Sequence, residues 1–183
     1  MKGDLLLVID MQNVYSKGGK WECRDTEGAA SNVLKIEQAK ACDKIIFTEF
    51  IPQKEPEGVW KDYSEVNAAV NNDVWSNEIL DSLKESASRN TLYSKSVYSS
   101  LKHPGVLEEC RKAKRVVVSG VVAECCVLST VLELIDMGIY VVYLTDAVSG
   151  LDVPKEKATE LILSGLSPLH VKIETTAEFL QEK

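Results

Sequence analysis

Short apolar runs alternate with amphipathic segments along this chain. Continuous apolar runs such as 5–10 and 115–122 are typical of strands covered on both faces, whereas apolar residues at helical spacing, as in 154–165, indicate helices with one buried face. The pattern predicts strands at 5–10, 44–50, 91–99, 115–122, 140–147 and 170–175. It predicts helices at 30–41, 76–86, 105–113, 125–138, 154–165 and 176–183.

Alternating strands and helices imply right-handed crossovers and a mainly parallel sheet. We therefore expect an α/β protein with a three-layer, Rossmann-like fold, in which about six strands carry helices on both faces. A chain of 183 residues suits one domain, which we place over residues 1–183. The segment 51–75 breaks the pattern because it is Pro-rich, aromatic and weakly periodic, and we expect a loop over a site there.

Local signals mark the ends of several expected helices. Ser76, with Glu78 close behind, is the expected cap of the helix at 76–86. Pro154 suits the first turn of the helix that follows it, and Gly138 and Gly165 suit positions where helices end.

The net charge and the cysteine content limit the classes of binding partner and the cellular compartment that we expect. The net charge is −7 and no basic stripe is present, so we expect no nucleic-acid partner. The apolar run near the amino terminus reaches Asp10 after five residues, which is too short for a signal peptide or a membrane span, so we expect a cytoplasmic protein with no membrane partner. The five scattered cysteines suit reduced thiols, and neither they nor the two histidines show zinc-site spacing.

Polar residues gather where the predicted strands end. In open parallel sheets, ligands bind outside the carboxyl ends of the strands, so these side chains are the candidates for chemistry. They are Asp10, Glu49, Lys95, Cys125, Cys126 and Asp146.

The adjacent cysteines Cys125 and Cys126 lie where a strand gives way to a helix. The amino terminus of a helix and a nearby ammonium such as Lys95 both lower the pKa of a thiol, so we expect a thiolate there. Asp10 then accepts the proton, and backbone amides hold an oxyanion. Spacing does not choose between the two thiols. The plainer reading is that a cysteine is an apolar filler, as we expect for Cys42 and Cys110.

Three ordered stretches, "LLLVIDMQNVY", "YSKSVYSS" and "SGVVAECCVLSTVLELIDMGIYVVYLTDA", together resemble the isochorismatase-like, or cysteine hydrolase, family. The resemblance spans residues 5–147 and implies that Cys126 is the nucleophile, Asp10 the general base and Lys95 the stabiliser of the thiolate. It implies an oxyanion hole made by the amides of Val122 and Cys126, and a cis peptide bond at 121–122. Substrate-binding positions implied in the same way are Gln12, Tyr15, Trp60 and Tyr98.

The chain departs from the family pattern at two places. Ala123 and Glu124 replace the usual Thr-Asp before the nucleophile, and Cys125 occupies a variable position. Nicotinamidases of the family bind a metal through residues that begin with Asp-x-His after the second strand, but this chain has Glu49 and Ile51 there. We therefore expect no metal and no cofactor, and nicotinamide becomes a doubtful substrate.

The leading hypothesis is a cysteine-dependent hydrolase of a small amide, ureide or N-carbamoyl compound, acting through a thioester and an Asp–Lys–Cys triad. Hydrolysis of a vinyl ether, as in isochorismatase, is an alternative that needs the aspartate but no thiol. A third hypothesis is an inactive member of the fold that binds a ligand or a partner, and a redox role for the adjacent cysteines is a minor fourth. By resemblance we also expect a homodimer or homotetramer.

Overall fold

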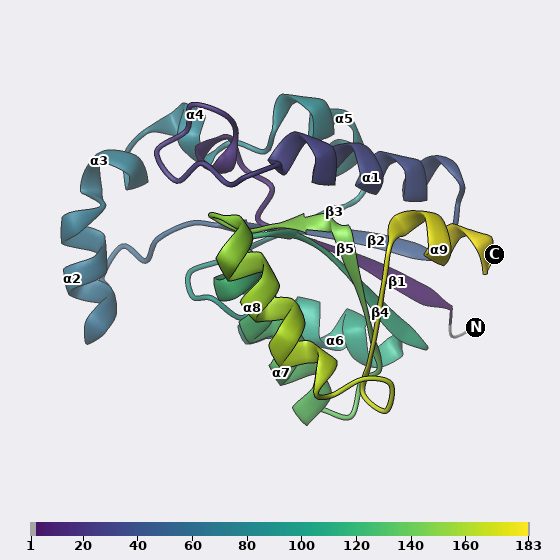
Figure 1. Ribbon diagram of the computed structural model, residues 1–183. Coiled ribbons are helices and arrows are strands. Elements are labelled where there is room, and N and C mark those ends of the chain that lie inside the picture. Colours follow the sequence, from purple (N-terminus) through teal and green to yellow (C-terminus); the bar gives the residue numbers. More distant parts are fainter. Residues whose placement is uncertain (1–2, 183) are drawn as a thin grey trace.

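The computed structural model describes residues 3–182. Within that range, six parallel strands form one sheet that lies between two layers of helices (Figure 1). The strand order is β3-β2-β1-β4-β5-β6, which places β1 and β4 at the centre. The strands are β1 (Asp4–Ile9), β2 (Lys44–Phe50), β3 (Thr91–Lys95), β4 (Arg115–Val121), β5 (Val141–Ser149) and β6 (Val171–Glu174).

Helices α1, α5 and α9 cover one face of the sheet, and α6, α7 and α8 cover the other (Figure 1). Helices α2 and α3 lie apart from both layers, beyond the end of the sheet where the strands finish. The helices are α1 (Thr26–Gln38), α2 (Val59–Val66), α3 (Ala68–Asn71), α4 (Val74–Asn77), α5 (Lys84–Arg89), α6 (Pro104–Lys112), α7 (Leu128–Asp136), α8 (Val153–Ser164) and α9 (Thr176–Gln181). Shorter turns are η1 (Asn13–Tyr15), η2 (Asp81–Leu83), η3 (Ser100–Lys102) and the π-helical turn η4 (Ala123–Val127).

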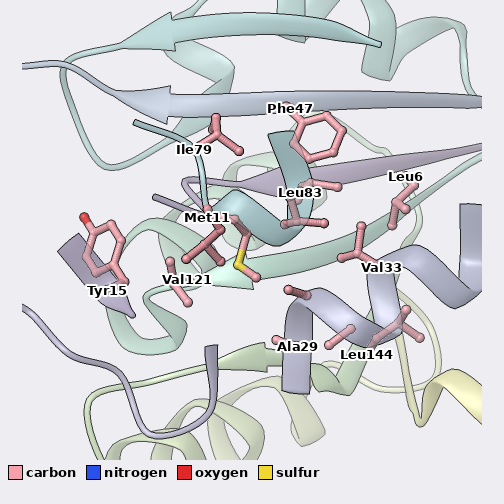
Figure 2. Close-up of a cluster of buried hydrophobic side chains, with 14 of the residues drawn as sticks. Leu6, Met11, Tyr15, Ala29, Val33, Phe47, Ile79, Leu83, Val121 and Leu144 are labelled. Carbon is pink, nitrogen blue, oxygen red and sulfur yellow. The ribbon is translucent and has the colours of Figure 1, made fainter. Parts of the chain in front are cut away.

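The apolar strands build two hydrophobic cores, one on each face of the sheet. Because successive side chains of a strand point to opposite faces, Leu6 and Val8 pack under α1 while Leu5 and Leu7 pack under α6 and α7. Figure 2 shows the first of these cores, where Leu6 meets Val33 of α1. Each fully buried side chain of this size contributes about 1.5–3 kcal/mol, so β1 is held firmly from both sides.

The structure confirms the expected fold class, and the parallel sheet has no antiparallel strand among the described residues. The expected helix at 30–41 begins earlier, at Thr26, because the Asp25 side chain accepts a hydrogen bond of 3.0 Å from the Gly28 amide. Gly138 follows α7 with φ at 74°, a conformation that favours glycine and ends the helix there.

The expected single helix at 76–86 is wrong. α4 ends at Asn77, and the chain then runs extended beside the segment after β1, where the Leu80 amide donates to the Met11 carbonyl at 2.9 Å. Helix resumes only with η2 and α5. Ser76 is not the cap, because its own amide donates to the Asp73 side chain at 3.0 Å.

The segment 51–75 is more ordered than the expected loop. It contains α2, α3 and the first residues of α4, three short helices that follow one another around the carboxyl edge of the sheet. The expected final helix at 176–183 is present as α9 up to Gln181, and residue 183 lies outside the described residues.

Candidate active site

Asp10 directly follows β1 and is fully buried. Its φ of 51° lies in the left-handed region, which aspartate enters more easily than most residues. Two contacts with Thr48 of β2 hold it there. The Asp10 amide donates to the Thr48 carbonyl at 3.0 Å, and the Thr48 hydroxyl donates to Asp10 Oδ1 at 2.8 Å. The second carboxylate oxygen is thereby turned toward the neighbouring site residues.

Lys95 is the last residue of β3, and its side chain is almost fully buried. Its Nζ lies 2.6 Å from Asp10 Oδ2, 3.5 Å from Cys126 Sγ and 3.0 Å from the Val97 carbonyl oxygen. The first contact is an ion pair, and the other two are hydrogen bonds that the ammonium donates. Lys95 therefore joins the carboxylate to the sulfur.

Cys126 lies in the π-helical turn η4, just after the cis peptide bond between Val121 and Val122. Its carbonyl accepts a hydrogen bond of 2.7 Å from the Thr130 hydroxyl. Cys125 is half-buried, whereas Cys126 is the thiol that contacts Lys95. The structure thus resolves which of the two adjacent thiols faces the buried lysine, and it contains the expected cis bond.

Close approach of β4 to β1 places Cys126 near Asp10. Gly120 has φ at 112°, and a Cβ at this position would lie 2.1 Å from the Ile9 carbonyl oxygen. Any side chain there would push apart the two strands that carry the thiol and the carboxylate. The glycine in the predicted strand is therefore required by the geometry of the site.

The pKa of Cys126 differs from the sequence expectation. Burial raises the pKa of the thiol well above its usual value of 9.0, the Asp10 charge raises it further, and Lys95 opposes both. This direction is opposite to the lowering of the pKa expected from the helix terminus and Lys95, because that reasoning leaves out burial and the neighbouring carboxylate. For Lys95, burial acts to lower the pKa, but Asp10 and Cys126 outweigh it and the pKa is raised.

Aromatic rings in contact with one another form a continuous wall beside the site, where the Lys95 Nζ lies 5.5 Å from the centroid of Phe50. Of the three predicted wall residues, Trp60 and Tyr98 have ring centroids 5.0 Å apart, and Tyr15 lies 5.8 Å from Trp21. Figure 2 shows Tyr15 at the margin of the core, with its hydroxyl directed away from the other labelled side chains. Cys126 raises the pKa of Tyr15 and of Tyr98, although burial is the larger cause in each case. Sequence reasoning missed three further rings of the wall, which are Trp21, Phe50 and Tyr63.

Gln12 ties the site to the segment around α4. Its side-chain oxygen accepts from the Phe50 amide at 2.8 Å, and its side-chain nitrogen donates to the carbonyls of Phe50 at 3.1 Å and Asn77 at 2.8 Å. These bonds give Gln12 a structural role. Its role in substrate binding and the oxyanion hole at Val122 and Cys126 stay predictions.

The described residues were compared with the requirements of a metal site and of a membrane-spanning helix. Within 3–182, no three His, Cys, Asp or Glu side chains lie close enough together to hold a metal ion, and Glu49 instead accepts a 2.6 Å hydrogen bond from Ser94. Over the same range, the chain forms no helix of the length and hydropathy needed to cross a membrane.

Comparison with known proteins assigns this chain to a family. The sequence model of the isochorismatase domain matches residues 4–177. A comparison with curated protein sequences finds no match. Among solved structures, the chain is similar to a cysteine hydrolase from Pseudomonas syringae pv. phaseolicola 1448A, with a TM-score of 0.82, 21% identity, and coverage of 97% of this chain and 91% of the other.

Two further solved structures share the fold at lower identity. An isochorismatase-like hydrolase from Alkaliphilus metalliredigens gives a TM-score of 0.76 with 19% identity, over 100% of this chain and 99% of the other. A nicotinamidase/pyrazinamidase from Bacillus subtilis gives 0.75 with 15% identity, over 95% and 100%. With its family match extending over nearly the whole described chain, this protein belongs to the isochorismatase family of hydrolases.

Proposed function

We propose that this protein is a cytoplasmic cysteine hydrolase that cleaves a C–N bond in a small amide, ureide or N-carbamoyl compound. The contact of Lys95 with both Asp10 and Cys126 is the observation that carries the proposal, because it brings a nucleophile, a base and a cation together in a buried place. The structural likeness to a nicotinamidase/pyrazinamidase supports an amide as the substrate class.

In the first half of the reaction, the Cys126 thiol gives its proton to Asp10 while the sulfur attacks the carbonyl carbon. The carbonyl electron pair moves to the oxygen, where the amides of Val122 and Cys126 stabilise the oxyanion. When the oxyanion collapses, the C–N bond breaks and the nitrogen takes the proton from Asp10. Ammonia or an amine leaves, and a thioester remains on Cys126.

In the second half, Asp10 takes a proton from water as the water oxygen attacks the thioester carbon. The C–S bond then breaks, the carboxylic acid product leaves, and the sulfur recovers its proton from Asp10. Lys95 stabilises the negative charge that passes between the carboxylate and the sulfur. The raised pKa of Cys126 suits this scheme, because a protonated thiol needs a base in contact with it.

Turnover of a panel of small amides, ureides and N-carbamoyl compounds tests the proposal. We expect ammonia or amine release by the wild type, loss of at least a thousandfold in Cys126→Ala, and near-normal rates in the matched variant Cys125→Ala. A trapped acyl group on Cys126, detected by mass spectrometry, would add direct support. Full activity in Cys126→Ala would overturn the nucleophile assignment, and pyruvate release from isochorismate by that variant would favour vinyl ether hydrolysis.

We also infer a homodimer or homotetramer. Leu161, Ile162 and Leu169, on and just after α8, are each at least half exposed to solvent in the single chain. Large exposed apolar surfaces are typical of sites that bind another protein, and these three side chains are the candidates for such a surface. Light scattering should give a mass of two or four chains, and a monomer at every concentration measured would contradict the inference.

A further inference from the structure

The proposed catalytic residues are almost closed off from solvent. Asp10 is fully buried, Lys95 is 5% exposed and Cys126 is 3% exposed. Even a small substrate must touch the sulfur to react, so part of the surrounding wall has to move before a carbonyl carbon can reach it. The question is which element of the wall moves.

Helix α2 is attached to the rest of the protein by few buried contacts. None of its eight residues is buried, and Val59 and Val66 are 80% and 84% exposed. Its contact with the rest of the site runs through two rings one helical turn apart, Trp60 and Tyr63. Figure 1 shows α2 projecting from the carboxyl end of the sheet, outside both helical layers. Few buried contacts make local opening inexpensive.

Tyr63 is the central ring of that contact. Its centroid lies 6.2 Å from Trp21, 6.0 Å from Phe50 and 5.3 Å from Trp60, so it links rings from three separate segments. Phe50 in turn has the Lys95 Nζ 5.5 Å from its ring centroid, so only one ring separates Tyr63 from the lysine of the site. Removing this one ring would break the contacts of α2 with Trp21 and with the edge-on Tyr63–Phe50 pair.

The structure has room for α2 to move. Gly58 precedes the helix with φ at 56°, and no atom lies within 4 Å of the place where its Cβ would be. A cavity of about 650 Å³ lies between the segment that leads to α2 and the helices that follow. Its lining includes Pro52 and Pro56 on one side and Ser64 and Asn71 on the other. Ser64 adjoins Tyr63 in sequence, so a shift of α2 into this space carries Tyr63 with it.

We propose that Tyr63 is the gate of the site and sets the size of the acyl group that Cys126 can accept. When α2 moves toward the cavity, the Tyr63 ring leaves Trp21 and Phe50 and opens a path to the sulfur. When it returns over a bound substrate, it excludes water and acyl groups too large for the space inside the ring wall. The size limit rests on the proposed function, whereas control of access does not.

Alkylation of Cys126 measures access without any substrate. In a Cys125→Ser background, second-order rates with iodoacetamide and with a bulkier fluorescein maleimide are followed by peptide mass spectrometry. Tyr63→Ala should raise the iodoacetamide rate at least tenfold and the maleimide rate by more. Trp60→Ala should act in the same direction. The matched control Val66→Ala, on the exposed face of the same helix, should leave both rates within twofold of the parent.

The outcomes separate the gate from the catalytic proposal. Equal rates in Tyr63→Ala and the parent, or a tenfold gain in Val66→Ala, would overturn the gate. Faster labelling in Tyr63→Ala, together with no turnover of any amide by the wild type, would support the gate and contradict the proposed reaction. If a substrate is found, Tyr63→Ala should raise kcat/KM most for the largest acyl groups, and the same gain for every size would overturn the size limit.

Discussion

The end of the sheet and the α2–α4 segment face each other across the site, and they are built in opposite ways. At the sheet end, Asp10, Lys95 and Cys126 are buried and held by contacts that cross several strands. In α2, no residue is buried and the attachment depends on aromatic rings. The comparison teaches that the proposed catalytic residues are held in place by the strand ends. Access to them, in our proposal, depends on α2, an element that can be displaced at a small cost in free energy.

The largest effect on stability should come from a substitution among the buried residues at the end of the sheet. Lys95→Met leaves the buried Asp10 carboxylate without its cation, and we expect a loss of about 3–5 kcal/mol in the free energy of unfolding. Urea denaturation measures it. The exposed Lys61 of α2 gives the control, since Lys61→Met should change the same quantity by less than about 0.5 kcal/mol. Similar losses in the two variants would erase the contrast.

Thr48 tests whether the carboxylate is held as firmly as its contacts suggest. Thr48→Val removes the hydroxyl that donates to Asp10 Oδ1, and we expect a loss of about 1.5–3 kcal/mol in the free energy of unfolding. Thr48→Ser keeps a donor at the same place and should recover most of the loss. Calorimetry or urea denaturation of both variants decides the point, and equal stability of the Ser and Val variants would argue against it.

Alkaline pH should act through parts of the molecule outside the α2–α4 segment, because that segment contains no cysteine. Burial raises the pKa of Cys23 and of Cys110 from 9.0 to about 12. Folding therefore favours the protonated thiols. Their contribution to stability is complete below pH 9, where the unfolded thiols are also protonated, and declines as pH rises toward 12.

Over the first pH unit above 9, the free energy of unfolding should fall by about 1 kcal/mol for each of these two thiols, or about 2 kcal/mol in total. Denaturation series at several pH values measure the slope. In Cys110→Ala the slope should be shallower, whatever the absolute stability of the variant. An unchanged slope would show that other groups dominate this range.

The smallest effect should come from the outer face of α2. Val66→Ser replaces an exposed apolar side chain, so we expect a change of less than about 0.5 kcal/mol in the free energy of unfolding. Urea denaturation gives the value. A loss above 1.5 kcal/mol would mean that this face is covered in solution, and it would contradict the weak attachment of α2 on which the gate depends.

The sequence predicted the sheet well because continuous apolar runs such as those of β1 and β4 leave few alternatives. The sequence also predicted that Asp10, Lys95 and Cys126 lie close together, because the carboxyl ends of parallel strands meet at the same edge of a sheet. The break after α4 was missed because it depends on the pairing of Gln12 with Ile79, residues remote in sequence. The short helices in 51–75 were also missed, because helices of one or two turns are too short to show a regular spacing of apolar residues.

Other features of the site were missed for physical reasons of the same kind. Thr48 contacts Asp10 only through the register of neighbouring strands, which no local pattern records. The pKa of Cys126 depends on burial and on a charge from another strand, so local reasoning predicted the wrong direction. Tyr63 joins the ring wall through contacts with two distant segments.

The strand order has a consequence for the length of one side chain. Lys95 ends β3, Asp10 follows β1, and β2 lies between them. Neighbouring strands are about 4.8 Å apart, so the charge on β3 must bridge roughly 10 Å of sheet to meet the carboxylate. A shorter cation on β3 would stop above β2. At this position the protein depends on the reach of four methylene groups as much as on the positive charge they carry.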